Sequence, residues 1–274
     1  MKIIGEKING TRRLVAKAIA ERDAVYIQNL AQKQVEAGAH WLDVNAGTHP
    51  DKEPQDLTWL INLVQGVVDV PLCLDSANPN ALRVAMKKVK KTPMINSISG
   101  ESSRLTSILP IVAEFGCDVI ALCMDDKGIP ASVEGRLDVI RKIMTETRAA
   151  GISDEKVFVD PLVMTIATNT DAPRTTFNTM RAIHAEFPQA HISCGLSNVS
   201  FGLPIRALIN RTFLVLAMEA GMDTAIIDPN DRELQAAMVT TDLLLGKDKH
   251  CLKYTRAYRA GLLAPAAQPE PKPA

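Results

Sequence analysis

Two patterns of apolar and polar residues alternate along the whole chain. Short runs rich in β-branched residues are each followed by a longer segment in which apolar residues recur every three or four positions. The short runs predict buried strands, and the longer segments predict helices packed on one face. Strands that alternate with helices in this way form a parallel sheet. Eight strands are predicted, over residues 3–5, 41–45, 70–75, 94–98, 119–124, 157–160, 191–194 and 224–227.

Two of the intervening segments show the helical period most clearly. The apolar positions of the first are Leu57, Leu60, Ile61, Val64, Val67 and Val68. The positions with the same spacing in the second are Leu234, Ala237, Met238, Thr241, Leu244 and Leu245. Asp231 precedes the second segment at the place of a helix N-cap. The eighth strand is therefore followed by its own helix.

These elements and the length of 274 residues predict an α/β fold with one domain, a (β/α)8 TIM barrel over residues 1–262. An open doubly wound sheet also alternates strands and helices, but it binds nucleotides through a glycine-rich first turn. No such turn follows Ile3 and Ile4. Residues 263–274 are rich in proline and alanine and predict a disordered tail.

Charge and cysteine usage narrow the setting of this domain. Lys and Arg total 31 and Asp and Glu total 31, so no net charge draws the chain to nucleic acid or to an anionic membrane. Residues 1–10 carry charges where a signal peptide needs an apolar stretch, and no segment approaches the roughly 20 apolar residues that span a bilayer. The five cysteines form no CxxC pair and are predicted to be buried, reduced thiols. We therefore expect a cytoplasmic protein.

Polar side chains stand at the carboxyl ends of nearly all the predicted strands, where barrel enzymes place their chemistry. They are Asp43, Asn45, Asp75, Asn96, Ser97, Asp125, Asp160, Ser197, Asn198 and Asp228. Each one alone can be interpreted as a helix N-cap, above all Asp75 before Pro79 and Asp228 before Pro229. N-caps do not account for carboxylates inside the strand ends at Asp75 and Asp160, because a buried carboxylate is costly unless it meets a donor.

The residues at the strand ends indicate the kind of ligand. A phosphate would need glycine-rich backbone and positive charge after the seventh and eighth strands, and the sequence there offers hydroxyls, amides and carboxylates instead. Carboxylates beside amides suit a ligand whose edge carries hydrogen-bond donors next to acceptors. The 2-amino-4-oxo-pyrimidine ring of a pterin is such a ligand.

Two other kinds of site are weighed against this one. A divalent metal could bind Asp43, Asp75 and Asp160, but no histidine joins them, because His40 and His191 fall at strand starts. We therefore expect no metal. A Schiff-base aldolase would need a lysine at a strand end deep in the barrel, and Lys7 is the only candidate.

Six short motifs follow one another in a fixed order. They are Gly5-Glu6-Lys7-Ile8-Asn9, Leu42-Asp43-Val44-Asn45, Leu72-Cys73-Leu74-Asp75-Ser76, Ile95-Asn96-Ser97, Asp160-Pro161-Leu162 and Gly195-Leu196-Ser197-Asn198-Val199-Ser200. With them the chain closely resembles the pterin-binding methyltransferases from residue 1 to about residue 262. Within that family the similarity is greatest to the stand-alone methyltetrahydrofolate:corrinoid/iron–sulfur protein methyltransferases. The folate domain of cobalamin-dependent methionine synthase is more distantly similar.

The resemblance implies a function and a set of site residues. The function is transfer of a methyl group between (methyl)tetrahydrofolate and the cobalt of a corrinoid (cobalamin), within one-carbon metabolism. The residues that would line the pterin pocket are Asp75, Asn96, Asp160, Asn198, Gly195, Ser197, Arg206 and Asp43. Of these, Asp75, Asn96 and Asp160 would hold the donor edge of the ring. Ile205 replaces a polar residue that is common in the family, so we expect no ligand contact there.

The chemistry gives Asn198 a catalytic role in this hypothesis. A methyl group on a tertiary amine is a poor electrophile, because the leaving group would be an unstabilised amide anion. Transfer therefore needs a proton or a strong hydrogen bond at that nitrogen in the transition state. The resemblance places Asn198 near this nitrogen, where its hydrogen bond can strengthen as charge shifts.

The corrinoid is expected on a separate protein that docks transiently. The segment from Asp248 to Lys253 comes close to the family's cobalt-ligating pattern Asp-x-His-x-x-Gly, but it has Lys253 in place of glycine. We interpret it as a loop that enters a last helix. The resemblance alone also implies a homodimer.

Two other functions stay open at this point. A dihydropteroate synthase shares the barrel and the pterin pocket, but it would need basic residues for a pyrophosphate leaving group, and residues 195–200 contain none. A non-catalytic folate-binding barrel would keep the pocket without turnover. The direction of transfer and the pathway, demethylation of a methylated substrate or acetyl-CoA synthesis, stay open as well.

Overall fold

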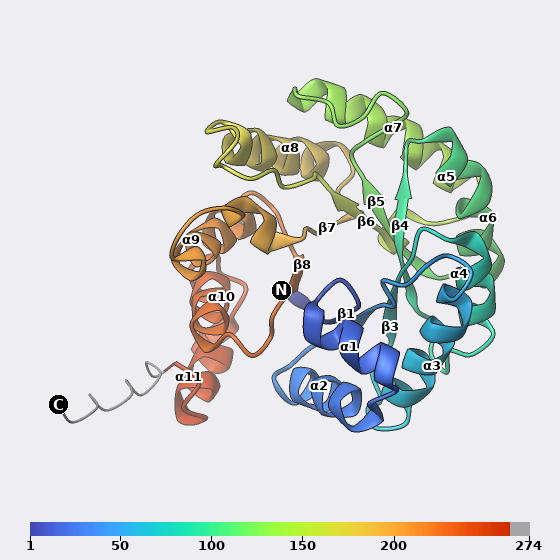
Figure 1. The fold of residues 1–274 in the computed structure, drawn as a ribbon. Helices are drawn as coiled ribbons and strands as arrows, with labels where there is room; N and C mark the ends of the chain where they lie inside the picture. Colours follow the sequence, from blue (N-terminus) through green and yellow to red (C-terminus); the bar gives the residue numbers. More distant parts are fainter. Residues whose placement is uncertain (264–274) are drawn as a thin grey trace.

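The structure is a computed structural model and describes residues 1–263. Its centre is a parallel sheet of eight strands in the order β7-β6-β5-β4-β3-β2-β1-β8. Gly195, just beyond β7, forms a parallel bridge with Ile226 of β8, and this bridge joins the two ends of the sheet. Helices surround the strands on the outside (Figure 1). The predicted TIM barrel is therefore confirmed.

All eight predicted strands are present; β2, β6 and β8 have the predicted bounds, and the ends of the other five are shifted. The first strand runs to Asn9 instead of Gly5, because it pairs with the second strand as far as Asn45. The third begins at Leu72, since Pro71 lacks an N–H and contributes only its carbonyl, which accepts the amide of Leu42. The strands are β1 Lys2–Asn9, β2 Trp41–Asn45, β3 Leu72–Asp75, β4 Met94–Ser99, β5 Asp118–Leu122, β6 Val157–Asp160, β7 His191–Ile192 and β8 Thr224–Ile227.

The helices follow the strands as predicted. Asp231 caps the helix after β8, and its carboxylate accepts the amide of Leu234 at 3.0 Å. The α-helices are α1 Arg13–Glu21, α2 Ala24–Glu36, α3 Glu53–Gln65, α4 Pro79–Met86, α5 Ser102–Ser107, α6 Leu109–Phe115, α7 Val133–Ala149, α8 Ala172–Glu186, α9 Arg206–Glu219, α10 Arg232–Leu244 and α11 Leu252–Arg259. The short 3-10 helices are η1 Asp154–Lys156, η2 Leu196–Ser200 and η3 Lys249–Cys251.

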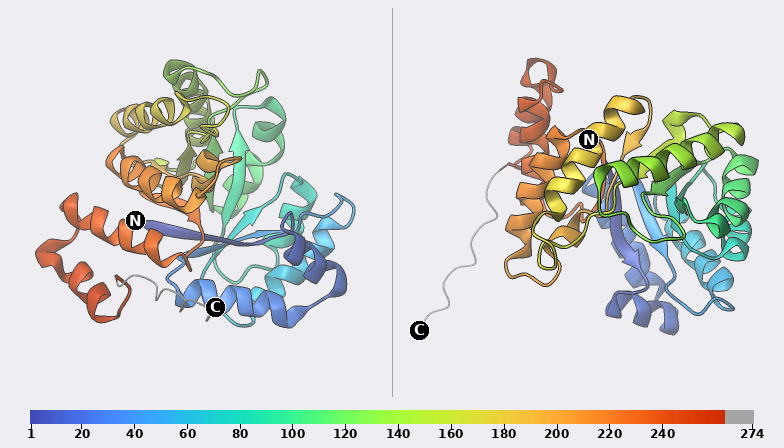
Figure 2. Two further views of the ribbon diagram at one scale, coloured as in Figure 1. Left: turned by 60° about the vertical axis from the view of Figure 1, so that its left-hand side comes forward. Right: turned by 90° about the horizontal axis from the view of Figure 1, so that it is seen from above.

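The last two α-helices lie together at one side of the barrel, coloured orange to red in Figure 2. The segment before α11 is a capped turn, because the carboxylate of Asp248 accepts the amides of Lys253 and Tyr254, each at 2.9 Å. This agrees with the predicted loop into a last helix. Residues 264–274, which include nearly all of the predicted tail, lie outside the described residues.

The core has two parts, one on each side of the sheet. The larger part fills the space between strands and helices and includes the predicted buried face of α3, with Leu57, Leu60, Ile61 and Val64 all fully buried. The smaller part lies inside the barrel. It consists of Ile4, Cys73, Met94, Ile120 and Phe158. These side chains separate the two ends of the barrel.

The cysteine prediction is correct at four positions and wrong at one. Cys73, Cys117, Cys123 and Cys194 are buried free thiols, whereas Cys251 is exposed. Cys251 lies in a left-handed turn, with φ of 56°, directly before α11. That turn is at the surface, so the thiol is exposed among the described residues. No helix within residues 1–263 is both long and apolar enough to cross a membrane.

Candidate active site

The first cluster of polar side chains spans the carboxyl ends of β2, β3 and β4. The side-chain amide of Asn45 donates to Asp75 Oδ2 at 2.8 Å. The side-chain amide of Asn96 donates to Asp43 Oδ1 at 3.3 Å. Parallel strands bring these ends together because their carboxyl termini share one edge of the barrel. The structure therefore gathers Asp43, Asp75 and Asn96, three of the predicted site residues, and adds Asn45.

The two carboxyl groups of this cluster share a dry environment. Asp43 is 3% exposed. Burial and the nearby charge of Asp75 raise the pKa of Asp43 well above its usual range, although the amide of Asn96 opposes the shift. Burial also raises the pKa of Asp75, against the effect of the Asn45 amide. Two adjacent buried carboxyls resist carrying two charges, so the proton resides on the more buried Asp43 and the charge on Asp75.

The second cluster lies at the ends of β6 and β7 and centres on Asp160. This side chain is 8% exposed, and its Oδ1 accepts the amide of Leu162 at 2.7 Å. The amide of Gly195 also donates to it. Burial raises the pKa of Asp160 to about 6, although both amides and the positive charge of Arg136 act to lower it. At neutral pH this carboxyl is therefore an ionised acceptor in a dry site.

Asn198 lies in η2, on the segment that follows β7, and its side chain is exposed. A Cβ atom at Gly195 would come within 3.1 Å of Asn198 Nδ2, so the amide lies directly over this glycine. Gly195 thus touches both the catalytic candidate and the carboxyl of Asp160. The structure brings these three predicted site residues together.

Arg206 and Ser197 hold this segment in place. The guanidinium of Arg206 donates to the carbonyl oxygen of Ser197 at 2.7 Å and to Ser200 Oγ at 3.0 Å. Ser200 Oγ in turn donates to Asn210 Oδ1 at 2.7 Å. These contacts fasten η2 to the start of α9. Both predicted residues therefore contribute to the loop that carries Asn198. Arg206 does so with its guanidinium, and Ser197 with its backbone carbonyl.

A pair of opposite charges lies at the ends of β1 and β8. The ammonium group of Lys7 forms an ion pair with Asp228. Glu6 precedes Lys7 in β1, and burial raises its pKa despite the nearby charge of Arg12. Because the ammonium group of Lys7 is held in an ion pair with Asp228, it is not a free nucleophile for a Schiff base. The alternative interpretation of Asp75 and Asp228 as helix N-caps does not hold, since the caps are Asn78 and the predicted Asp231.

A cavity of about 500 Å³ opens beside the first cluster. Its wall includes Asn45, Asp75, Thr11, Thr48 and Glu53, from the loops after β1, β2 and β3. Thr48 Oγ1 is buried there without a hydrogen-bond partner in the described part of the chain. Within residues 1–263, no three His, Cys, Asp or Glu side chains form a group that could hold a metal ion. The mouth therefore offers polar hydrogen-bonding groups.

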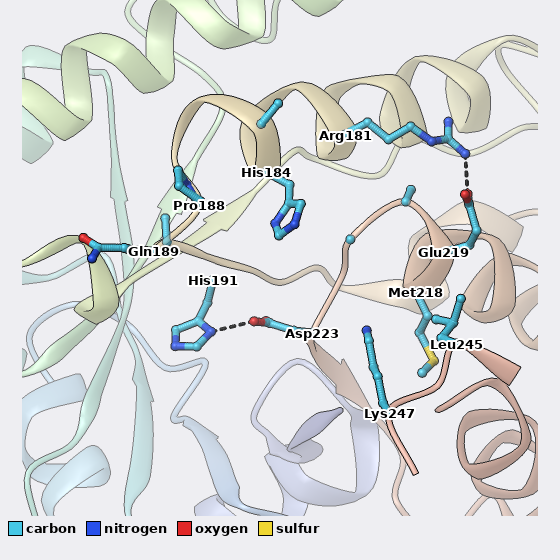
Figure 3. Close-up of a pocket in the computed structure, with 14 residues that line it drawn as sticks. Arg181, His184, Pro188, Gln189, His191, Met218, Glu219, Asp223, Leu245 and Lys247 are labelled. Atoms are coloured by element: carbon cyan, nitrogen blue, oxygen red, sulfur yellow. Dashed lines mark hydrogen bonds and ion pairs between the residues drawn. The ribbon is translucent and has the colours of Figure 1, made fainter. Parts of the chain in front are cut away.

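A larger cavity, of about 620 Å³, lies at the opposite end of the barrel (Figure 3). There His191 Nδ1 contacts Asp223 Oδ2 at 2.6 Å, and His184 and Lys247 face the same space. The ring of His191 also stacks on Phe158, with centroids 4.4 Å apart. His191 begins β7, so this cavity is at the amino ends of the strands, where barrel proteins place stability rather than catalysis. We assign the site to the smaller cavity for this reason.

Asn45 and Arg136 are the main site residues that the sequence did not assign. The sequence does contain an indication for Asn45: it lies two residues after Asp43 and therefore faces the same side of the strand. The sequence contains no such indication for Arg136, because this residue lies in the first turn of a helix outside all six motifs.

The fold and the site define a class: a (β/α)8 barrel protein that gathers acids and amides at the carboxyl ends of its strands. The chain belongs to the pterin-binding enzyme family, whose description matches residues 7–228. The methylcorrinoid:tetrahydrofolate methyltransferase of Eubacterium limosum is 39% identical over 267 residues, which cover 97% of this chain and 98% of that protein. Methionine synthase of Mycobacterium leprae is 29% identical over 238 residues, which cover 82% of this chain but 20% of that protein.

Solved structures of dihydropteroate synthase share the fold. The Yersinia pestis enzyme with a pterine–sulfa conjugate has a TM-score of 0.67 at 17% identity, and covers 90% of this chain and 94% of its own. A second structure of that enzyme has a TM-score of 0.64 at 18% identity, with coverages of 90% and 92%. At these identities the likeness concerns the barrel alone.

Proposed function

We propose that this protein transfers a methyl group between tetrahydrofolate and the cobalt of a corrinoid that a separate protein carries. One observation carries the proposal. The chain matches a methylcorrinoid:tetrahydrofolate methyltransferase from end to end at 39% identity, and its strand ends present the acids and amides that a pterin needs. The E. limosum protein is named for methyl transfer from a methylated corrinoid to tetrahydrofolate. We propose the same direction here.

The pterin would bind with its donor edge on Asp75, Asn96 and Asp160. Asn45 occupies one oxygen of Asp75, which leaves the other for an N–H of the ring. Asp160 is ionised at neutral pH and already oriented by two backbone amides, so it accepts a further donor without rearrangement. Asn96 supplies a carbonyl and an amide side by side, and Asp43 holds its amide from behind.

Asn198 is the proposed catalytic residue. As the methyl group leaves or reaches the ring nitrogen, the charge on that nitrogen changes, and a donor that strengthens its hydrogen bond lowers the barrier. The side-chain amide of Asn198 is exposed and has no hydrogen-bond partner among residues 1–263. It lies over Gly195, whose own amide binds Asp160. One short segment therefore joins the group that holds the pterin to the group that serves its reacting nitrogen.

The corrinoid supplies the cobalt that gives up or takes the methyl group, and its protein would dock over the open mouth. Asp248 and His250 support a separate carrier, because the carboxylate of Asp248 is used as the cap of α11. His250 has a left-handed φ of 58° within this cap. These residues therefore form a structural turn rather than a cobalt ligand set.

Replacement of Asn198 tests the function and the role together. Asn198→Ala should slow methyl transfer about ten- to a thousandfold, the range for loss of one preorganised donor. The assay is a single turnover with a methylated corrinoid protein and tetrahydrofolate. Asn62→Ala, at an exposed position of α3, is the matched control and should leave the rate unchanged. Unchanged turnover in Asn198→Ala would refute the role, and no turnover by the unaltered protein would refute the function.

We further propose that the protein is a cytoplasmic homodimer. Four buried free thiols support a reducing compartment. Leu208, Val215 and Leu216 are exposed at helical spacing on α9, and such an apolar stripe supports contact with a second copy. Light scattering after size exclusion should give twice the mass of the chain. A monomer at micromolar concentration would contradict the dimer, and a membrane or secreted fraction would contradict the compartment.

A further inference from the structure

Arg136 is a buried guanidinium that the proposed chemistry does not use directly. It lies in the first turn of α7 and is 3% exposed. Two effects disfavour a cation there. The amino end of a helix carries a partial positive charge, and burial removes the guanidinium from water. No carboxylate within residues 1–263 lies close enough to Arg136 to form an ion pair. A charge kept at such a cost indicates a role that a neutral side chain does not fill.

All the hydrogen bonds of Arg136 in the described chain go to backbone carbonyls. Nη1 donates to the carbonyl oxygens of Pro161 at 2.7 Å and Leu162 at 3.2 Å. Nε donates to the carbonyl oxygen of Pro130 at 3.0 Å. The planar fork of an arginine can bind several oxygens at once, which a lysine cannot do as rigidly. Arg136 therefore fixes the two residues that directly follow Asp160.

The turn that Arg136 holds is strained and carries a contact to the site. Leu162 has a φ of 62°, a left-handed conformation that a side chain with a Cβ rarely adopts. In this conformation the amide of Leu162 points back and donates to Asp160 Oδ1 at 2.7 Å. Bonds to the carbonyls of Pro161 and Leu162 offset the cost of the turn. The carboxyl of Asp160 is oriented as long as the turn keeps this shape.

From these contacts we propose that Arg136 is a positioning residue for pterin binding, which holds the turn at Leu162 and so keeps the Asp160 carboxyl group aimed at the ligand. The inference rests on the proposed function, because it concerns Asp160, one of the residues proposed to hold the pterin. Arg136 touches neither the ligand nor the reacting atoms. It acts through the turn at Leu162 and through its positive charge.

The other groups that face Asp160 do not supply this charge. Cys123, after β5, and Cys194, after β7, are both close to the carboxyl. Burial raises the pKa of each thiol well above its usual value, so both are neutral. Arg136 on α7 is the charged group that acts on Asp160 from the described elements around it, and its charge lowers a pKa that burial has raised. Removal of the charge should raise the pKa of Asp160 further.

Binding of tetrahydrofolate from pH 5 to pH 8 tests the inference in three proteins. In the unaltered protein the affinity should fall below a midpoint near pH 6, where Asp160 takes up a proton. In Arg136→Gln the midpoint should move to higher pH, because the positive charge that opposes the effect of burial on Asp160 is gone. Arg136→Lys keeps the charge and should restore the midpoint, with weaker binding at every pH. The ligand's own titration is the same in all three, so differences report on the protein.

A control on the same helix separates positioning from general stability. Lys142 of α7 donates to the carbonyl oxygen of Gly100 at 2.6 Å, and Lys142→Met should change the melting temperature without moving the midpoint. An NMR titration of the Asp160 carboxyl carbon, assigned with Asp160→Asn, reads the same pKa without ligand. An unchanged carboxyl pKa in Arg136→Gln would overturn the inference even if the melting temperature fell. Failure of the unaltered protein to bind tetrahydrofolate would instead overturn the proposed function, with the carboxyl titration still deciding the role of Arg136.

Discussion

Gly195→Ala adds one methyl group at the residue that contacts both Asn198 and Asp160. The backbone of Gly195 has φ of −73° and ψ of 86°, so an alanine meets no left-handed strain. The added Cβ would lie 3.1 Å from Asn198 Nδ2, which is closer than the 3.4 Å at which ordinary contact begins. Asn198 is exposed and can turn away. The variant should therefore fold with a stability loss below about 1 kcal/mol, while the amide moves by a few tenths of an ångström.

The size of the kinetic effect follows from that displacement. A misplacement of about 1 Å can cost a hundredfold in rate, so a few tenths should lower the rate of methyl transfer about three- to tenfold. The affinity for tetrahydrofolate should change less, because the Gly195 amide still reaches Asp160. Single-turnover rates and calorimetric affinities, measured on the same preparations, separate the two effects.

A double variant tests whether the methyl group acts through Asn198. If it does, Gly195→Ala combined with Asn198→Ala should react no more slowly than Asn198→Ala alone, since the displaced group is already gone. The control is Ala220→Gly at the end of α9, a change of one methyl group far from the mouth. Gly47→Ala would not serve, because the φ of Gly47 is 60° and alanine would be strained there. Rate losses that multiply in the double variant would refute the contact as the cause.

Further outcomes follow from the carboxyl groups. Burial and the charge of Asp75 keep Asp43 protonated, so Asp43→Asn should leave the affinity for tetrahydrofolate within about threefold. Asp75→Asn should lower that affinity at least tenfold. Equal losses of affinity in the two variants, measured by calorimetry, would contradict this assignment. The pKa of Asp160 is about 6 in the folded protein, against an ordinary value of 3.8. The folded state therefore binds a proton more tightly than the unfolded state does, and the stability that this proton contributes is lost as the pH rises from about 4 to 6. The linkage relation gives a loss of roughly 3 kcal/mol in the free energy of unfolding. Urea unfolding at several pH values should show this loss in the unaltered protein and not in Asp160→Asn.

The sequence predicted the barrel and the polar residues at its strand ends because both depend on local patterns. Each strand carries its own β-branched run, and a barrel brings the residues after these runs to one edge whatever the loops do. This is why Asp75, Asn96 and Asp160 were found. The strand limits were less certain, since pairing decides them: β1 runs on to Asn9 only because β2 offers partners as far as Asn45.

The contacts that tune the site depend on residues far apart in the chain. Arg136 precedes Pro161 by 25 residues and reaches it only because α7 packs beside the turn after β6. No spacing in the sequence indicates that contact. The same holds for Lys7 and Asp228, which come from the first and last strands and meet because the sheet closes. Sequence patterns therefore identify which groups are present, and the fold decides their charge and orientation.

The dryness of the mouth has its origin in the strand period of two residues. Side chains two positions apart on a strand face the same side, so each residue of the inner apolar cluster has its successor one layer nearer the mouth. The successive pairs are Ile4 and Glu6, Cys73 and Asp75, Met94 and Asn96, Ile120 and Leu122, and Phe158 and Asp160. In four of these five pairs an apolar side chain lies beneath a carboxyl or an amide. Water is thus excluded from below, and this burial raises the pKa of Glu6, Asp75 and Asp160.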